Sequence, residues 1–170
     1  MTLPARSVPA QQLLDALRAC GVKFIVSVPD THQKSLLALL DTVSDIRVIT
    51  CCTEDEAVCV AMGLWIGGAP VAMMIQHAGL YACVNHLRGV GLDLKAPLFM
   101  LVGLLGRDVE KAPRDNAGSM VRLAEPLLDT LGISHYLVDG PEDVALIEPA
   151  YREALRNEAP VAVLIGAQTA

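Results

Sequence analysis

The sequence predicts an α/β domain, a three-layer sandwich in which helices cover both faces of a six-stranded, mostly parallel sheet. Apolar runs of strand length alternate along the chain with segments in which apolar residues recur at the helical period. Hydrophobic residues make up 53% of the chain but aromatic residues only 4%, so the apolar excess lies in Ala, Val, Leu and Ile, as in buried parallel strands. A chain of 170 residues is expected to form a single domain, residues 1–170.

The first half of the chain holds three expected helices and three expected strands, with a turn or capping signal at several of their ends. Gly21 lies just past the first helix, and Pro29 stops the first strand. Thr31 is expected to cap the second helix, because its side-chain oxygen can accept a backbone N–H. The helices are residues 9–20, 32–43 and 54–66, and the strands are residues 23–28, 46–51 and 70–76.

The second half repeats this alternation around one long loop. Strands that alternate with helices pair in parallel through crossover connections, so we expect one mostly parallel sheet. Residues 106–118 form a charged loop that contains Pro and Gly, and long loops in compact domains often carry function. The expected helices are residues 80–92, 120–131 and 141–157, and the expected strands are residues 97–103, 135–138 and 160–165.

Charge and composition argue against several classes of protein. Thirteen basic and nineteen acidic residues give a net charge of −6, and aromatic residues are scarce, so we expect no nucleic-acid partner. The longest apolar stretches, residues 71–75 and 97–105, fall short of the roughly 20 residues that cross a bilayer, so we expect no membrane span. Residues 1–6 show no charged region followed by an apolar block, so we expect no signal peptide.

The cysteines indicate a reducing compartment. Their number is odd and no two have Cys-x-x-Cys spacing, so we expect reduced thiols in a cytoplasmic protein rather than disulfides. A metal site built from His77, Cys83 and His86 is not expected, because this spacing does not place three ligands on one face. The five cysteines are Cys20, Cys51, Cys52, Cys59 and Cys83.

The carboxyl ends of the strands are where we expect a ligand, since parallel α/β sheets bind ligands at this edge. Neither a nucleotide-binding fingerprint nor a Gly-x-Ser-x-Gly nucleophile motif occurs. A nucleophilic pair of Cys52 with His77 is geometrically possible at this edge. His135 begins its strand, so it is expected at the opposite edge in a structural role. The segments expected at the carboxyl edge are residues 29–32, 51–54, 76–79 and 103–118.

Glu54 is the carboxylate at this edge that most needs an explanation. Thr53 and Glu56 have the spacing of a capping box, which gives Glu56 a structural role and leaves Glu54 without one. The helix that follows is nearly all apolar with small residues, so we expect it to be buried and closely packed. A purely structural alternative stays open, because a negative charge at a helix N-terminus stabilises by about 0.3–1 kcal/mol.

The segments at the carboxyl edge resemble those of a known family. Glu54, followed nine residues later by Gly63 in a small-residue helix, resembles the pyrimidine-binding (PYR) domain of thiamine diphosphate enzymes. The order of the remaining pieces resembles sulfopyruvate decarboxylase alpha subunits and the N-terminal half of phosphonopyruvate decarboxylases. The resemblance covers about residues 8–165. Its pieces are Val-Pro-Asp-Thr at 28–31, Thr-Glu-Asp-Glu at 53–56, Gln-His-Ala-Gly-Leu at 76–80, Gly-Arg at 106–107 and Leu-Leu-Asp-Thr-Leu-Gly-Ile at 127–133.

The resemblance implies the thiamine diphosphate-binding fold of PYR type and a role for Glu54. In the family, the matching glutamate hydrogen-bonds N1′ of the cofactor pyrimidine and relays the protonation that lets the 4′-imino group take the C2 proton. Glu54 is the only match for this catalytic role. The resemblance also implies that the thiamine diphosphate site includes Pro29, Asp30, Gln76 and Gly79 along with Glu54.

The resemblance further implies a split active site. In the family, another domain binds the diphosphate through Mg²⁺ with a Gly-Asp-Gly…Asn motif, and this chain contains no Gly-Asp-Gly. We therefore expect a partner subunit of similar size that carries the motif and holds the metal, in a hetero-oligomer. We expect no metal ligands in this chain.

Three departures from the family pattern affect the expected substrate pocket. His77 stands where relatives commonly have Asn, Tyr81 stands where they have a small residue, and Gly106-Arg107 stands where they have Arg-Gly. We expect His77 to be catalytic, because an imidazole there can donate a hydrogen bond or move a proton. His32, Tyr81 and Arg107 are expected to contact substrate, with the basic loop that also holds Lys111 and Arg114 supplying counter-charge.

Taken together, these features predict the alpha-type subunit of a two-subunit thiamine diphosphate-dependent decarboxylase (a carboxy-lyase). Its substrate is expected to be a 2-oxo acid similar to sulfopyruvate or phosphonopyruvate. Two alternatives stay open from the sequence. One is a carboligase or carbon–carbon lyase on the same scaffold, and the other is a non-catalytic α/β binding or regulatory module.

Overall fold

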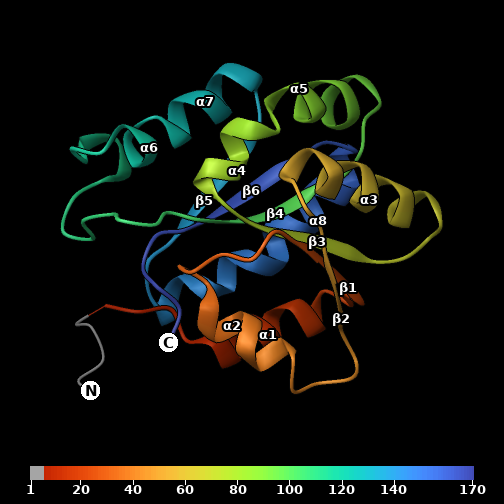
Figure 1. The fold of residues 1–170 in the computed structure, drawn as a ribbon, viewed down its shortest axis with the longest axis horizontal. Coiled ribbons are helices and arrows are strands. Elements are labelled where there is room, and N and C mark those ends of the chain that lie inside the picture. The colour runs from red at the N-terminus through yellow and green to blue at the C-terminus, as the bar shows by residue number, and fades with distance from the viewer. Residues whose placement is uncertain (1–5) are drawn as a thin grey trace.

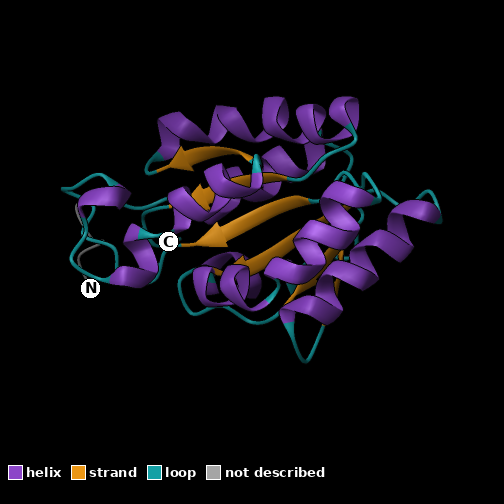
Figure 2. Cartoon of the chain, turned by 90° about the horizontal axis from the view of Figure 1, so that it is seen from above, coloured by secondary structure: helices purple, strands orange, loops and turns teal. Residues whose placement is uncertain are grey.

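The computed structural model describes residues 6–170 and shows one six-stranded sheet in which all strands are parallel (Figure 1). The strand order is β2-β1-β3-β4-β6-β5. In Figure 2 the arrowheads point to the side on which the C-terminus is marked, so the C-terminal segment lies near the carboxyl edge, where Thr169 forms a bridge with Val8. The strands are β1 Phe24–Ser27, β2 Arg47–Thr50, β3 Val71–Gln76, β4 Phe99–Gly103, β5 Ser134–Val138 and β6 Val161–Ile165.

Helices cover both faces of the sheet, which confirms the predicted three-layer α/β sandwich (Figure 1). One layer holds α1 Ala10–Ala19, α2 Lys34–Leu40 and α8 Ile147–Asn157. The other holds α3 Glu54–Ile66, α4 His77–Ala82, α5 Val84–His86, α6 Ser119–Arg122 and α7 Ala124–Leu131. Each layer packs its own apolar cluster against the sheet. No helix within residues 6–170 is long and apolar enough to cross a membrane.

Two helices at the carboxyl edge begin elsewhere than predicted. Thr31 does not cap the second helix: Asp30 Oδ1 instead accepts the N–H of His32, at 2.9 Å, and α2 begins only at Lys34. The helix predicted at 80–92 begins three residues earlier, directly after β3, with His77 in its first turn. This position matters for the site, because it fixes the His77 side chain at the end of β3.

The helix predicted at 80–92 is also interrupted. After α4 and α5, the chain continues as a π-helix over Leu87–Asp93. Gly91 in this segment lies close to the start of β6, since a Cβ there would be 2.5 Å from Cγ of Pro160. Close packing on Pro160 therefore accompanies the departure from regular α-helix.

Helical segments in the second half are likewise shorter than predicted. The predicted helix at 120–131 is split at Leu123 into α6 and α7. The predicted helix at 141–157 opens with a 3₁₀ segment, Pro141–Leu146, before α8. The long loop holds a single 3₁₀ turn, Pro113–Asp115.

Helix α3 is less buried than predicted. Only Ala57, Val58 and Ala61 are buried, while Cys59 is exposed and Ile66 is 69% exposed. Beyond its acidic first turn the helix is apolar on all sides, so the outer face of this part is an apolar surface that the described chain leaves uncovered. The prediction of a closely packed buried helix is therefore wrong for the isolated chain.

Candidate functional site

The first turn of α3 separates the roles of its two glutamates. Thr53 Oγ1 accepts the N–H of Glu56 at 3.5 Å, and Glu56 Oε2 accepts the N–H of Cys52 at 2.7 Å. The predicted capping box is thus confirmed, with its return bond one residue earlier than in the standard motif. Glu56 is used by the helix terminus, and Glu54 is not.

Glu54 lies against Gly79 of α4. A Cβ at Gly79 would overlap Cγ and Oε1 of Glu54, so only glycine leaves room for this carboxylate. Glu54 is partly exposed, and no hydrogen bond or ion pair to its side chain is found within residues 6–170. A carboxylate at the ligand edge, cradled by a glycine and without a partner among the described residues, fits a ligand that offers it a hydrogen-bond donor.

Cys83 lies close to this carboxylate but is not a reactive thiolate. Burial, together with the smaller effect of the negative charge of Glu54, raises the pKa of the Cys83 thiol to about 12. Because the thiolate is the nucleophilic form, Cys83 behaves as a small buried hydrophobic residue. All five cysteines are free thiols.

Asp30 and Gln76, both predicted to bind cofactor, are bound to each other. Asp30 is 1% exposed. Its Oδ1 accepts from Gln76 Nε2 at 2.9 Å and from the N–H of His32, and its Oδ2 accepts from Gln33 Nε2 at 3.1 Å. Gly103 makes room for this carboxylate, because a Cβ there would overlap Oδ2. Asp30 therefore positions Gln76 and His32, while Pro29 before it is exposed.

Gln33 is a member of this cluster that sequence reasoning missed. It is fully buried, and its Nε2 also donates to the carbonyl of Ile75 at 3.1 Å, at the end of β3. A signal was available, because Gln33 lies three and seven residues before Leu36 and Leu40, on the apolar face of the predicted helix. A polar residue in that stripe indicates a buried hydrogen-bonding role.

His77 is brought to the carboxyl edge as predicted, but inside the protein. The side chain is 4% exposed, and Nε2 lies 2.9 Å from the carbonyl oxygen of Leu105. A carbonyl only accepts, so Nε2 carries the proton of this bond. Burial lowers the pKa of His77, with Leu105 and Asp30 opposing the shift, so the ring is neutral at pH 7. Its Nδ1 is then an unprotonated acceptor, and it is buried without a partner within residues 6–170.

His32 is also buried, with 5% exposure. Burial lowers the pKa of its imidazole, and the Asp30 carboxylate opposes this shift. Its Nε2 has no partner within the described chain. His32 therefore resembles His77 in being a neutral, buried ring at the carboxyl edge with one unsatisfied nitrogen.

Tyr81 joins two helices. Its hydroxyl donates to the carbonyl of Met120 at 2.6 Å, which ties α4 to α6, and burial raises the pKa of the phenol. The hydroxyl is engaged within the chain, so the structure favours a positioning role for Tyr81 over the predicted contact with substrate.

The basic loop is mostly neutralised within the chain. Lys111 pairs with Asp108 at 2.8 Å. Arg114 pairs with Glu125 and Asp129 at 3.0 and 2.5 Å. The expected counter-charge from Lys111 and Arg114 is therefore not available as predicted.

Arg107 is the inward-facing cation of this loop. Its side chain is 2% exposed and forms an ion pair with Asp139, at the end of β5. It also donates from Nη2 to the carbonyl of Lys111 at 3.0 Å. A Cβ at Gly166 would overlap both Arg107 and Asp139, so this glycine is required by the buried ion pair.

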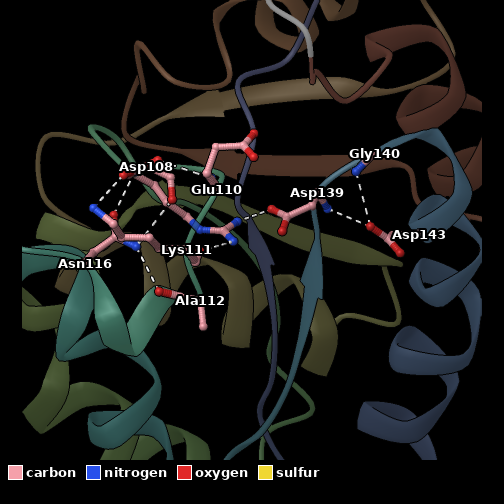
Figure 3. A network of polar contacts seen from close by, with 9 residues as sticks. Asp108, Glu110, Lys111, Ala112, Asn116, Asp139, Gly140 and Asp143 are labelled. Carbon is pink, nitrogen blue, oxygen red and sulfur yellow. Dashed lines mark hydrogen bonds and ion pairs between the residues drawn. The ribbon is translucent and has the colours of Figure 1, made fainter.

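The loop is held in shape by Asn116, which sequence reasoning did not single out. Asn116 Oδ1 accepts the N–H of Asp108 at 2.7 Å, and its Nδ2 donates to the carbonyl of Ala112 at 2.9 Å. Figure 3 shows this network and, beside it, Asp139 between the loop and Asp143. Asp143 Oδ2 accepts the N–H of Asp139 at 2.9 Å. The loop is therefore an ordered wall of the carboxyl edge.

Other chemistries considered from the sequence gain no geometric support. Within the part of the chain that the structure describes, no group of three or more His, Cys, Asp or Glu side chains is placed to hold a metal ion. Cys52 and His77 share no hydrogen bond there, since His77 Nε2 is bound to Leu105. His135 lies at the amino end of β5, as predicted, and bonds Asp129 Oδ1 at 3.0 Å.

Comparison with known proteins agrees with this geometry. Residues 9–121 match the family model described as thiamine pyrophosphate enzyme, N-terminal TPP binding domain. Sulfopyruvate decarboxylase subunit alpha of Methanococcus maripaludis is 28% identical over 159 residues, 93% of this chain and 94% of that protein. The protein of the same name from Methanocaldococcus jannaschii is 28% identical over 156 residues, 91% of each chain.

Longer proteins match as well. Phosphonopyruvate decarboxylase of Streptomyces viridochromogenes is 27% identical over 137 residues, which are 80% of this chain but 34% of that protein. Among solved structures, benzoylformate decarboxylase from Polynucleobacter necessarius superposes with a TM-score of 0.70 over 93% of this chain and 29% of that one. At 21% identity, this last likeness bears on the fold alone.

Proposed function

This chain belongs to the thiamine pyrophosphate enzyme family, as an N-terminal TPP binding domain, and we propose that it is the alpha-type subunit of a two-subunit decarboxylase acting on a 2-oxo acid. The relatives named subunit alpha are similar to it over more than nine-tenths of both chains. Their name and that of the phosphonopyruvate decarboxylases support a sulfopyruvate- or phosphonopyruvate-like substrate. We propose that residues 1–170 form one PYR domain.

The observation that carries this proposal is the cradle of Glu54 by Gly79. The Glu54 side chain makes no hydrogen bond within residues 6–170, and a residue larger than glycine at position 79 would displace it. We propose that Glu54 hydrogen-bonds the pyrimidine of thiamine diphosphate and holds or moves the proton at N1′. The bound cofactor would supply the electron sink for loss of CO₂ from a 2-oxo acid.

The other edge residues would orient and enclose the site. Asp30 holds Gln76 in place through the 2.9 Å bond described above, and Pro29 and Gly79 would flank the pyrimidine. His77 presents its neutral Nδ1 beside them and would accept or move a proton in the substrate pocket. Through these residues the chain would serve the pyrimidine and substrate half of a shared site.

The diphosphate half would come from a partner subunit carrying Gly-Asp-Gly…Asn and Mg²⁺. The uncovered apolar face of α3 supports such a partner, because this helix begins at Glu54 and ends at Ile66, which is 69% exposed. A subunit that completes the cofactor site would also cover this face. The free thiols support a reducing, cytoplasmic setting for the hetero-oligomer.

The split site predicts how the cofactor binds. We expect the isolated chain to bind thiamine diphosphate weakly, and to bind it tightly only with the partner subunit and Mg²⁺. Titration calorimetry on the chain alone, on the partner alone and on the complex, each with and without Mg²⁺, measures this. Micromolar binding by the chain alone would contradict the split site.

The close contact between Gly79 and Glu54 predicts that a single methyl group added at position 79 lowers activity. In the assembled enzyme, Gly79→Ala is expected to lower kcat by about 10²-fold, because small misplacements of a catalytic group have effects of this order. Gly89→Ala is the matched control, since a Cβ at Gly89 meets no atom within 4 Å. Equal turnover of the two variants would show that the position of Glu54 is not critical.

His77 is expected to set substrate preference. We expect His77→Asn to lower kcat/KM about tenfold or more and to alter the order of preferred 2-oxo acids, because a proton-transfer group is lost. Cofactor affinity should stay within a few-fold. A panel of aliphatic, aromatic, sulfonated and phosphonated 2-oxo acids measures the profile. His135→Asn, at the opposite edge of the sheet, is the control. A lower melting temperature with an unchanged profile would indicate a purely structural His77.

A further inference from the structure

A cavity of about 290 Å³ lies beside the carboxyl ends of β4 and β6. Leu105 and Gly106 follow β4, and Gly166 follows β6. Arg6 and Gln168, from the two terminal segments, complete its rim. The remaining lining residues are His32, Arg107 and Val109.

Two arginines line the cavity, and one of them is paired with Asp139. Arg6 and Arg107 both line the cavity, whereas no Asp or Glu does. Arg107 is held at a fixed orientation by Asp139 and by the carbonyl of Lys111. An anionic group entering the cavity would therefore meet Arg6, which is exposed, and a guanidinium held in place by its ion pair with Asp139.

Two residues that line this cavity each have an unsatisfied buried atom. Four buried side-chain nitrogen or oxygen atoms lack a partner within residues 6–170, and two of them, Arg107 Nε and His32 Nε2, belong to residues that line it. Leaving a buried donor unpaired costs about 1–3 kcal/mol, so such atoms call for an explanation. Arg107 Nε–H can only donate, which fits an oxygen acceptor.

Two lining residues, Gly106 and Gly166, occupy positions that favour glycine. Gly106 has φ +79°, a left-handed conformation that favours glycine. Gly166 cannot carry a Cβ, because it would overlap the Arg107–Asp139 pair.

We propose that this cavity binds the acidic oxyanion group of a small organic acid. The inference rests on the proposed function for one source of that group, the second acidic group of a sulfonated or phosphonated 2-oxo acid. A free oxyanion that acts as an effector has the same chemistry and is the other source. In both cases Arg6 and Arg107 would face the oxyanion oxygens, and His32 would lie beside them.

Inorganic sulfate is a direct probe on the isolated full-length chain. We expect sulfate, titrated at constant ionic strength against chloride, to perturb the amide resonances of Gly106, Gly166 and Gln168 and the ring of His32. Arg6→Ala should weaken binding about three- to tenfold, the scale of one lost charged contact. Arg47→Ala removes an equally exposed cation from edge strand β2 and should change the dissociation constant less than about twofold.

A second variant tests whether sulfate binding needs the volume of the cavity. Val109→Phe would fill the cavity without removing a polar group, and we expect it to weaken sulfate binding more than about tenfold. Perturbations scattered over other basic surface residues, or equal effects of Arg6→Ala and Arg47→Ala, would overturn the proposal. Arg6 is exposed, so its variant tests the site even where Val109→Phe disturbs folding.

The assembled enzyme distinguishes the two sources. If the group belongs to the substrate, Arg6→Ala raises KM for 2-oxo acids with a second acidic group and spares pyruvate, and sulfate competes with the former. If it belongs to an effector, sulfate changes the rate with pyruvate without competing. Sulfate binding by a chain that supports no decarboxylation would leave this site standing and sink the proposed function. An active enzyme whose isolated chain binds no sulfate would overturn this site and leave the proposed function standing.

Discussion

Glu54→Gln is expected to lower turnover of the assembled enzyme by about 10²–10⁴-fold, the range for loss of a general acid–base group. Glutamine keeps the shape of the side chain, so it still fits against Gly79. It cannot hold or release a proton at the position of the carboxylate. The fold, the assembly and the helix terminus should stay intact, because no hydrogen bond to the Glu54 side chain is found within residues 6–170. Steady-state release of CO₂ from the 2-oxo acid, with bound cofactor quantified, measures the effect.

Glu56→Gln is the matched control, two residues away in the same helical turn. Glu56 accepts the N–H of Cys52 at 2.7 Å, and a glutamine carbonyl can accept the same bond. Turnover of this variant should therefore be nearly normal. The assignment of Glu54 fails if Glu54→Gln, with cofactor bound, turns over at a rate close to that of Glu56→Gln.

The fold was predictable from the sequence because its signals are local. Alternation of apolar runs with helix-period segments is enough for six parallel strands and two helical layers. Helix starts were less predictable where side chains near the sheet edge compete for backbone groups. Asp30 displaced the cap expected at Thr31, and α4 began at His77, whose ring bonds Leu105 far along the chain. Such contacts depend on which strands are neighbours.

In the candidate site, too, features with a local signal were predictable and contacts between distant segments were not. Glu54 could be singled out because its neighbours, Thr53 and Glu56, satisfy the helix terminus and leave it free. Asp30 and Gln76 were correctly expected at the edge, but their bond to each other joins residues 46 positions apart. The partner of Arg107 was not predictable, since Asp139 follows β5 and the strand order places β6 between β4 and β5.

Removing one partner of the Arg107–Asp139 pair is expected to lower the stability of the fold strongly. Asp139→Ala leaves the Arg107 guanidinium buried, with 2% exposure and no countercharge. Breaking a buried pair in this way costs about 3–5 kcal/mol. For a chain of this size that corresponds to a fall in melting temperature of roughly 6–20 °C. Urea unfolding and thermal melts of the purified chain measure both quantities.

A surface pair and a double variant complete the test. Asp93→Ala removes the partner of Arg88, but Asp93 is 62% exposed, so the loss should be about 1 kcal/mol or less. Arg107→Met combined with Asp139→Ala removes both charges and should recover much of the stability lost in Asp139→Ala, because no unpaired ion then stays buried. The pair lies where a Cβ of Gly166 would be, so both charged groups are closely packed against the backbone at this position. If Asp139→Ala and Asp93→Ala destabilise equally, the pair is not a buried ion pair in solution, and the fixed orientation of Arg107 loses its support.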